Sequence, residues 1–176
     1  AGWKPQQMID GISGIMSLAA ASGEDLGTTS DIVTDALTAF GLQAGDAGHF
    51  ADVLAQASAN ANTNVSMLGE SFKYVAPVAG AMNYSVEDTS LALGLMANAS
   101  IKGSMAGTAL KTSLANMAAP TDSMAAAMDK YGISLTDSEG NMKSLRGVID
   151  NLRGSLGGLS ETEQTAAAST IFGKEA

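Results

Sequence analysis

The sequence predicts an all-α fold: a bundle of about eight or nine short helices with one small β-hairpin near residues 133–143. Three observations lead to this prediction. Apolar residues recur at helical spacing in one segment after another, as expected of helices that each bury one face. Short connections rich in Gly, Pro, Asn, Asp and Ser separate these segments. Only the stretch after Gly132 alternates apolar and polar residues in the manner of a strand.

The first two predicted helices lie before residue 42. Pro5 suits the first turn of a helix, where its missing N–H has no intrahelical partner, and Ser22 and Gly23 end that helix. Thr29 or Ser30 is the expected N-cap of the second helix. The second apolar face then comprises Ile32, Val33, Ala36, Leu37 and Phe40, and Gly41 stops the helix.

Polar residues and one proline delimit the next two predicted helices. Asp46 is the expected N-cap of the third helix. The polar run 60–64 connects it to the fourth. Pro77 lies inside the fourth helix and should kink it or end its regular part, and Asn83 closes it.

The fifth and sixth predicted helices differ in side-chain size. Ser85 begins a motif that resembles a capping box, and the broad apolar band after it indicates a largely buried helix. Lys102 and Gly103 then form a turn, and Ser104 is the expected cap of the sixth helix. Gly107 in that helix is costly unless a neighbouring backbone approaches closely, which favours a tight helix–helix contact over an anion cradle at a helix N-terminus.

The segment after Pro120 contains three further helices and the hairpin. A short helix is expected over 122–131, and the hairpin with its polar turn follows. Residues 145–156 carry the clearest amphipathic pattern in the chain. A capping box from Ser160 to Glu163 starts the last helix, which Gly173 ends.

Composition limits the functions that the chain can have. With 176 residues the chain predicts one domain over 1–176, which we interpret as a segment of a longer protein. The net charge of −9 argues against tight binding to nucleic acid, because that affinity depends on Lys and Arg at phosphates. The chain has no Cys and therefore no disulfide or thiolate metal site. Its uncharged stretches contain too many Asn, Gln, Ser and Thr to predict a membrane span.

Residues that could carry chemistry are few, and each has a simpler explanation. His49 is the only histidine, and its place in a first turn favours a surface or capping role. Asp137, Glu139 and Asn141 faintly resemble a calcium loop, but their spacing fits a turn better. Acidic pairs at other helix starts complement helix dipoles. We therefore expect no catalytic residue, no cofactor-binding residue, no cofactor and no metal ligand, and we expect that the protein is not an enzyme.

Seven short motifs follow one another along nearly the full chain. They are AGW at 1–3, VTDALTAFGL at 33–42, ADVLA at 51–55, FKYVAPVA at 72–79, IKGSMAGTAL at 101–110, YGIS at 131–134 and IFGKEA at 171–176. In this order they resemble the core region of phage tail tape-measure proteins, of the type found in long non-contractile tails and related tail-like particles. The order of the motifs carries the resemblance.

The resemblance implies a structural virion component that acts in tail assembly and tail-length determination, and in genome delivery. The implied partners are tail-tube, baseplate or tail-tip and tail-chaperone proteins, together with other copies of the same protein. The implied location is the virion tail, after synthesis in the bacterial host cytoplasm from a phage or prophage gene. An alternative is a membrane-active module that forms a channel during genome ejection and contacts the membrane at infection. The helices expected over 86–99 and 106–119 motivate that alternative.

Overall fold

The computed structural model describes residues 3–173, so the ends of the first and last of the seven motifs lie outside the described residues. Within this range the protein is all-helical, with nine α-helices and one short 3₁₀ helix. Contacts between Cα atoms divide the chain into two compact units, the first ending at Thr108 and the second beginning at Ala109.

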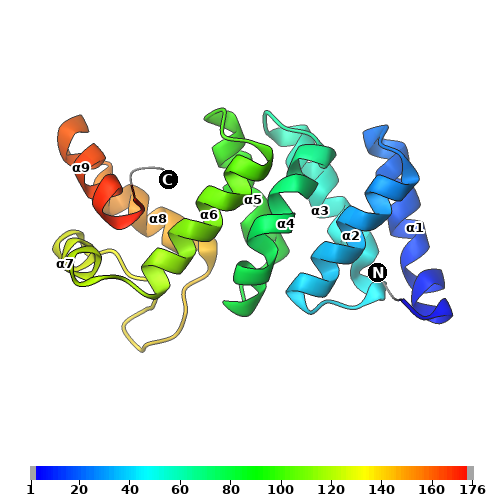
Figure 1. Ribbon diagram of the computed structural model, residues 1–176, viewed down its shortest axis with the longest axis horizontal. Helices are drawn as coiled ribbons and strands as arrows, with labels where there is room; N and C mark the ends of the chain where they lie inside the picture. The colour runs from blue at the N-terminus through cyan, green and yellow to red at the C-terminus, as the bar shows by residue number, and fades with distance from the viewer. Residues whose placement is uncertain (1–2, 174–176) are drawn as a thin grey trace. The chain divides into compact units, whose positions relative to one another are not determined.

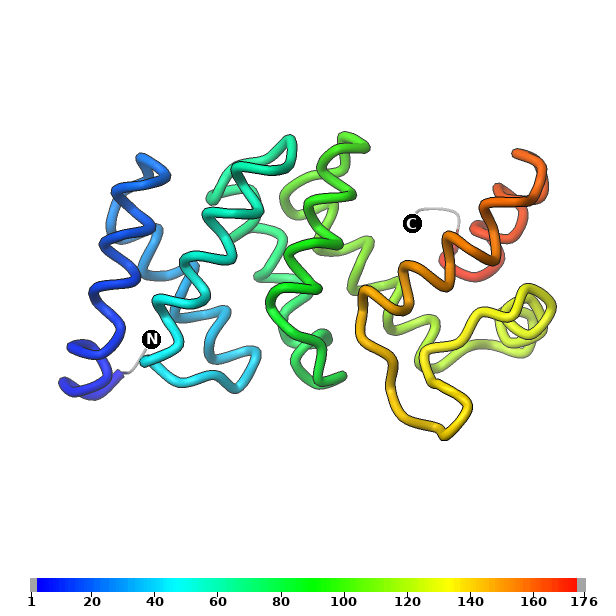
Figure 2. The backbone as a smooth tube through the Cα atoms, turned by 180° about the vertical axis from the view of Figure 1, so that it is seen from behind, coloured from blue at the N-terminus to red at the C-terminus, as the bar shows by residue number. Residues whose placement is uncertain are grey.

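The first unit contains five complete α-helices, the 3₁₀ helix η1 and the start of a sixth α-helix (Figure 1). Their bounds are α1 Pro5–Ser22, α2 Leu26–Phe40, η1 Ala44–Asp46, α3 Ala47–Asn60, α4 Val65–Ala81, α5 Val86–Asn98 and α6 Gly103–Ala118. Each helix packs mainly on its second neighbour: α1 on α3, α2 on α4 and α3 on α5. Figure 2 shows this unit from behind, with α1, α3 and α5 forming one row and α2 and α4 the other. The first unit is thus a stack of helical hairpins in two layers.

Successive hairpins of this stack meet at a glycine in corresponding helical positions. The helices α2, α4 and α6 begin at Leu26, Val65 and Gly103, at nearly equal intervals along the chain. Gly69 on α4 lies against the side chain of Ile32 on α2. One hairpin later, Gly107 on α6 lies against the backbone of Ser71 on α4. Each glycine is the fifth residue of its helix, and the residue that it meets is the seventh residue of the other helix, so the positions of the two contacts match.

The close backbone approach predicted at Gly107 is confirmed. A Cβ atom at this position would lie 2.9 Å from both the carbonyl carbon and the Cα of Ser71, and closer still to its carbonyl oxygen. The Ser71 hydroxyl also donates to the Gly103 carbonyl at 2.7 Å. The backbone of α4 occupies the space beside Gly107, which supports a helix–helix contact there.

Aromatic rings fill the core between the two layers. Phe50 and Phe72 are 0% and 2% exposed, and their ring centroids lie 5.5 Å apart in an edge-to-face arrangement. Phe40 contacts Phe72 in the same manner at 5.9 Å. Such pairs contribute about 0.5–1.5 kcal/mol beyond the burial of their area. The chain has only four Phe residues, and this cluster uses three of them.

Helix α1 has the predicted ends, but α2 begins earlier than predicted. Pro5 is the first residue of α1, and Gly23 ends it in the left-handed conformation with φ of 72°. The N-cap of α2 is Asp25, whose carboxylate accepts from the backbone N–H of Thr28, so the prediction of Thr29 or Ser30 was wrong. Thr29 is fully buried, and its hydroxyl donates to the Asp25 carbonyl at 2.9 Å. This bond satisfies the hydroxyl inside the first helical turn, where the sequence pattern suggested a cap.

Two further local expectations need refinement. Asp46 precedes α3 as predicted, but its carboxylate accepts from the Gln43 N–H at 2.8 Å and makes no capping bond to α3. Pro77 does not end α4, which continues to Ala81. Asn83 follows that helix with a positive φ. Asn is one of the few residues that adopt this conformation readily at a helix end, so it closes α4 as predicted.

The second unit contains the end of α6 and three shorter helices. These are α7 Asp122–Tyr131, α8 Leu145–Leu156 and α9 Glu161–Ile171. Helix α7 packs on α9, and the side-chain amide of Asn116 on α6 donates to the carbonyl of Phe172 at 3.1 Å. The capping box from Ser160 to Glu163 is present as predicted.

The predicted β-hairpin is not confirmed. Within the described residues no sheet is found, and residues 133–143 make a single antiparallel bridge between Thr136 and Met142. Two backbone bonds flank this bridge, from the Asp137 N–H to the Asn141 carbonyl at 2.9 Å and from the Lys143 N–H to the Leu135 carbonyl at 2.8 Å, and side chains bond to other backbone groups. The Asp137 carboxylate accepts from the N–H groups of Glu139 and Asn141, and the Asn151 side-chain carbonyl oxygen accepts from the Ser134 N–H at 3.1 Å. The segment is therefore an ordered loop, held by a single bridge and by side chains of its own turn and of α8.

Candidate functional site

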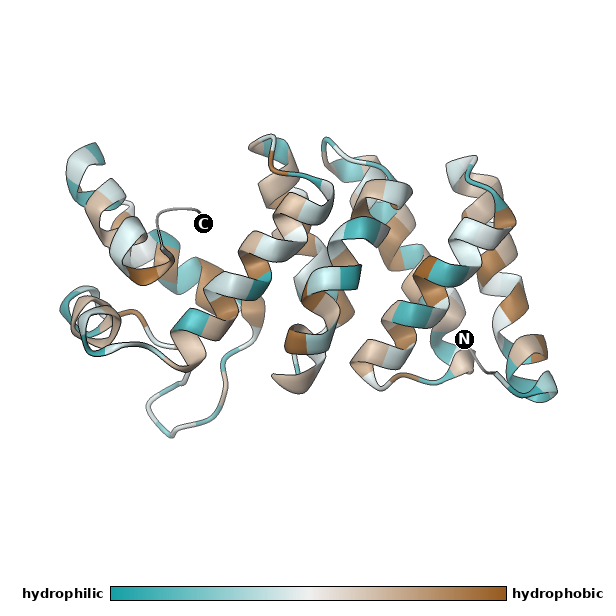
Figure 3. Ribbon diagram, in the orientation of Figure 1, coloured by the Kyte–Doolittle hydropathy of each residue, from teal (hydrophilic) through white to brown (hydrophobic). Residues whose placement is uncertain are grey.

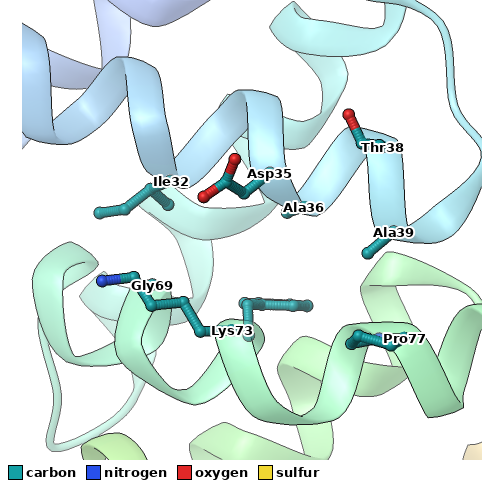
Figure 4. A pocket seen from close by; sticks show the side chains of 9 residues that line it. Ile32, Asp35, Ala36, Thr38, Ala39, Gly69, Lys73 and Pro77 are labelled. Carbon is teal, nitrogen blue, oxygen red and sulfur yellow. The ribbon is translucent and has the colours of Figure 1, made fainter. Parts of the chain in front are cut away.

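A groove lies between α2 and α4 in the first unit (Figure 4). It encloses about 490 Å³. Helix α2 contributes one wall and α4 the other, and the residues that line it are Ile32, Asp35, Ala36, Thr38, Ala39, Gly69, Phe72, Lys73 and Pro77. At one end of this face Gly69 of α4 lies against the side chain of Ile32 on α2.

Charged side chains lie along the rim of the groove. Lys73 Nζ is 2.5 Å from Glu70 Oε1, and both side chains are about half exposed, at 49% and 48%. The hydrogen bond from Lys73 and the negative charge of Glu70 raise the pKa of Lys73, and the more distant Asp35 adds to the effect. An exposed pair of this kind contributes little to stability. Its main effect is to make the rim polar.

The floor of the groove is apolar. Phe72 is 2% exposed and Ala36 is 3% exposed. Pro77 lacks an N–H, so it cannot make the helical bond to the carbonyl of Lys73. The nine lining residues include a carboxylate and an ammonium but neither a His nor a Cys. The groove thus combines an apolar floor with a charged rim.

His49 lies at a second, smaller hollow of about 190 Å³, which is lined by residues of α3 and α5, by the end of α2 and by the connections before α3 and α5. Its Nε2 is 2.5 Å from Glu87 Oε1, and the two side chains are 60% and 48% exposed. The surface role predicted for His49 agrees with this exposure. Burial raises the pKa of Glu87, but a backbone hydrogen bond and His49 outweigh it, so the pKa of Glu87 lies below its ordinary value. The sequence could not reveal this pair, because its members are 38 residues apart.

Tyr84 lies beside the same hollow and is 5% exposed. Its hydroxyl is buried and has no hydrogen-bond partner among the described residues. Burial raises the pKa of Tyr84, so the phenol remains protonated at neutral pH. Sequence reasoning did not single out Tyr84, because nothing local distinguishes a buried Tyr hydroxyl from a solvated one.

The acidic clusters considered from the sequence serve local structure. Asp25 and Glu163 accept hydrogen bonds at the starts of α2 and α9. The Asp137 carboxylate holds an exposed turn. In residues 3–173 we find no group of three or more His, Cys, Asp or Glu residues that could hold a metal ion. The described helices also include none that is long and apolar enough to span a bilayer.

Comparison with known proteins gives the context for these features. Residues 1–173 match the family described as "Phage-related minor tail protein". The chain is 42% identical over 174 residues to the "Tape measure protein" of Pneumococcus phage Dp-1, covering 99% of this chain and 15% of that protein. It is 28% identical over 163 residues to the "Probable tape measure protein" of Escherichia phage P2, covering 92% of this chain and 20% of that protein. No solved structure matches it significantly. The family match covers nearly the whole chain, and the chain therefore belongs to the phage-related minor tail protein family.

Proposed function

We propose that this chain is a structural module of a tape-measure protein in a phage tail. The observation that carries the proposal is the 42% identity to a tape measure protein over 99% of the chain. The module takes part in tail assembly and has no enzymatic role. Because the family match covers residues 1–173, we treat residues 1–176 as one module despite the two compact units.

The module contributes to assembly rather than measuring length by its own extent. Its longest described helix, α1, has 18 residues. At the rise of an α-helix this corresponds to a length of about 27 Å. The chain spans only 15% and 20% of the two relatives, so most of a ruler would lie in other parts of such a protein. The groove between α2 and α4, with its apolar floor and charged rim, is where we place contact with tail-tube, baseplate or tail-tip, or tail-chaperone proteins.

The net charge of −9 supports a place in a tail that also conducts DNA. Surfaces of like charge repel, so an acidic module would not retain the passing phosphate backbone. We accordingly propose the virion tail as its location, after synthesis in the bacterial host cytoplasm.

Electron microscopy of particles whose parent gene lacks the codons for residues 1–176, deleted in frame, tests the proposal. We expect no tails, or tails of aberrant length, because an assembly module is missing. Tails of near-normal length that fail to infect would instead favour the alternative of a membrane-active module used in genome delivery. Normal, infectious particles would overturn the proposed function.

A further inference from the structure

An apolar stripe runs along the exposed side of α1. Met8, Ile9, Ile12 and Met16 are 55%, 66%, 44% and 55% exposed. At the periodicity of an α-helix these positions occupy an arc of roughly 100°. Gly14, which contacts the backbone of Ala47 and Gly48 on α3, lies on roughly the opposite side of the helix. In Figure 3, α1 carries more apolar than hydrophilic colour along its length.

From this stripe we infer that α1 pairs with α1 of a second copy of this chain, antiparallel and about a two-fold axis at Ile12. The spacing of Met8, Ile12 and Met16 is self-complementary, whereas Ile9 has no exposed counterpart, because reversal about Ile12 carries it to the position of Ile15, which is 3% exposed. Met8 and Met16 lie equally far from Ile12 on either side, so reversing the helix exchanges the two Met residues and leaves Ile12 in place. In the pair, Ile12 faces Ile12, and Met8 of each copy faces Met16 of the other. A two-fold interface requires such self-complementarity.

Charge supports a second copy as the occupant. The chain carries −9 overall, but Asp10 is the only charged residue within α1, and it bonds to Gln6 at 2.9 Å. Lys4 directly precedes α1. In the antiparallel pair, Lys4 of one copy lies opposite Ala20 of the other, near the last helical turn and within one turn of Glu24. A cation is favourable at a helix C-terminus, where the helix dipole is negative, and beside a carboxylate.

The exposed face of α1 carries larger side chains than the point at Gly14 where α1 meets the backbone of α3. Where α1 meets α3, the residues are small: Gly14 lies on the backbone of Ala47 and Gly48. The exposed side of α1 carries two Met and two Ile residues instead, which hold a neighbouring helix at a greater distance. Met side chains also adapt to a facing Met. The exposed side is therefore suited to a separate helix pair rather than to another hairpin of the internal stack.

The oligomeric state of the chain 1–176 is the first test. A single helix pair is smaller than a standard interface of about 1,600 Å², so we expect a weak dimer whose population rises with concentration in sedimentation velocity. Ile12→Glu places two carboxylates at the axis and should leave a monomer with an unchanged helical circular dichroism spectrum. Met105→Glu is the matched control, because Met105 is 65% exposed on α6 and should not affect the dimer. A wild-type chain that stays monomeric up to high micromolar concentration overturns the inference.

Cysteine cross-linking tests the geometry, and the chain has no Cys of its own. Under mild oxidation, Ile12→Cys should form a disulfide-linked dimer. Met8→Cys and Met16→Cys should cross-link when mixed, but neither should do so alone. A Met8→Cys chain that cross-links efficiently to itself would indicate a parallel pair and would overturn the antiparallel arrangement. These outcomes are independent of the tail role, which the deletion experiment tests separately.

Discussion

The hydroxyl of Ser71 on α4 donates to the carbonyl oxygen of Gly103 on α6 at 2.7 Å, about one helical turn before the point where Gly107 lies against the Ser71 backbone. One buried residue thus supplies both a hydrogen bond and a surface for close packing. Ser71 is 2% exposed. The start of α6 is therefore fixed in both position and direction relative to α4.

Gly107→Ala should destabilise the protein. The new methyl group would meet the Ser71 backbone, which cannot move as a flexible side chain could. Overpacking of this kind costs about 1–3 kcal/mol, which exceeds the helix-propensity gain of about 1 kcal/mol. The free energy of unfolding, from urea titration, should fall.

Gly154→Ala is the control for that change. Gly154 is an exposed residue within α8, and nothing lies within 4 Å of a Cβ atom placed there. The same Gly-to-Ala change should raise stability by up to about 1 kcal/mol. If both variants were stabilised alike, the close approach at Gly107 would be refuted.

Tyr84→Phe should leave stability unchanged or increase it slightly, because the buried hydroxyl has no hydrogen-bond partner among the described residues. Tyr131→Phe is the comparison, since the Tyr131 hydroxyl accepts from Lys130 Nζ at 3.1 Å at the surface and should also have little effect. Thermal unfolding measures the effect of each change on stability. Removing one partner of a buried hydrogen bond would lower the stability by about 1–3 kcal/mol, which is readily told apart from no change. A large loss in Tyr84→Phe alone would show that its hydroxyl is bonded.

Asn151→Ala should loosen the loop 133–143. The Asn151 side chain accepts from the Ser134 N–H and donates to the Gly132 carbonyl, both at 3.1 Å. Without it these backbone groups lose their partner, and amide hydrogen exchange at Ser134 and its neighbours should accelerate. Arg153→Ala, an exposed change on the same helix, should leave exchange in the loop as it is.

Stability should fall in acid, and two carboxylates should account for part of the decline. Hydrogen bonds from the Thr28 hydroxyl and N–H hold the pKa of Asp25 below its ordinary value of 3.8. Those from the Ser160 hydroxyl and N–H hold the pKa of Glu163 below its ordinary value of 4.5. A carboxylate whose folded-state pKa is lowered stabilises the fold above its unfolded pKa, and this stabilisation disappears as the pH falls through its folded pKa.

The double variant Asp25→Asn, Glu163→Gln checks this assignment. Asn still caps a helix and Gln still completes a capping box, but neither titrates. Below about pH 4.5, stability measured by chemical denaturation should therefore fall less steeply in the variant than in the wild type. Parallel pH profiles would show that other carboxylates cause the decline.

Local features of the fold could be predicted because their determinants are adjacent in sequence. Pro5 and Gly23 delimit α1, and Ser160 with Glu163 starts α9, through bonds within one helical turn. Gly107 indicated that the backbone of another helix comes close to α6. The sequence did not identify that neighbour as Ser71, which lies two helices earlier in the chain. The sequence did not reveal the His49–Glu87 pair, because its members are 38 residues apart.

The errors also have physical causes. The cap expected at Ser104 is wrong, because α6 begins at Gly103 and Ser104 already lies inside the helix. The sequence around Thr29 fits an N-cap. In the structure, however, Thr29 is buried, and its hydroxyl donates to the Asp25 carbonyl at the start of the same helix. The loop 133–143 alternates like a hairpin, because Ile133 and Leu135 are buried at 4% and 7% exposure. Yet Asn151, on the helix that follows the loop, satisfies the Ser134 N–H. Alternation revealed which side chains face inward but not which groups would bond to the backbone.

The nearly equal spacing of α2, α4 and α6 along the chain determines how the first unit yields to force. Each helix packs mainly on its second neighbour, so a hairpin peeled from one end breaks contacts with the next hairpin only. Pulling on the chain should release it in discrete steps, each lengthening the tether by roughly 13 nm for a hairpin of this size at about 3.4 Å per residue. A module of this kind can be drawn out through a narrow passage one hairpin at a time, without first losing its whole structure.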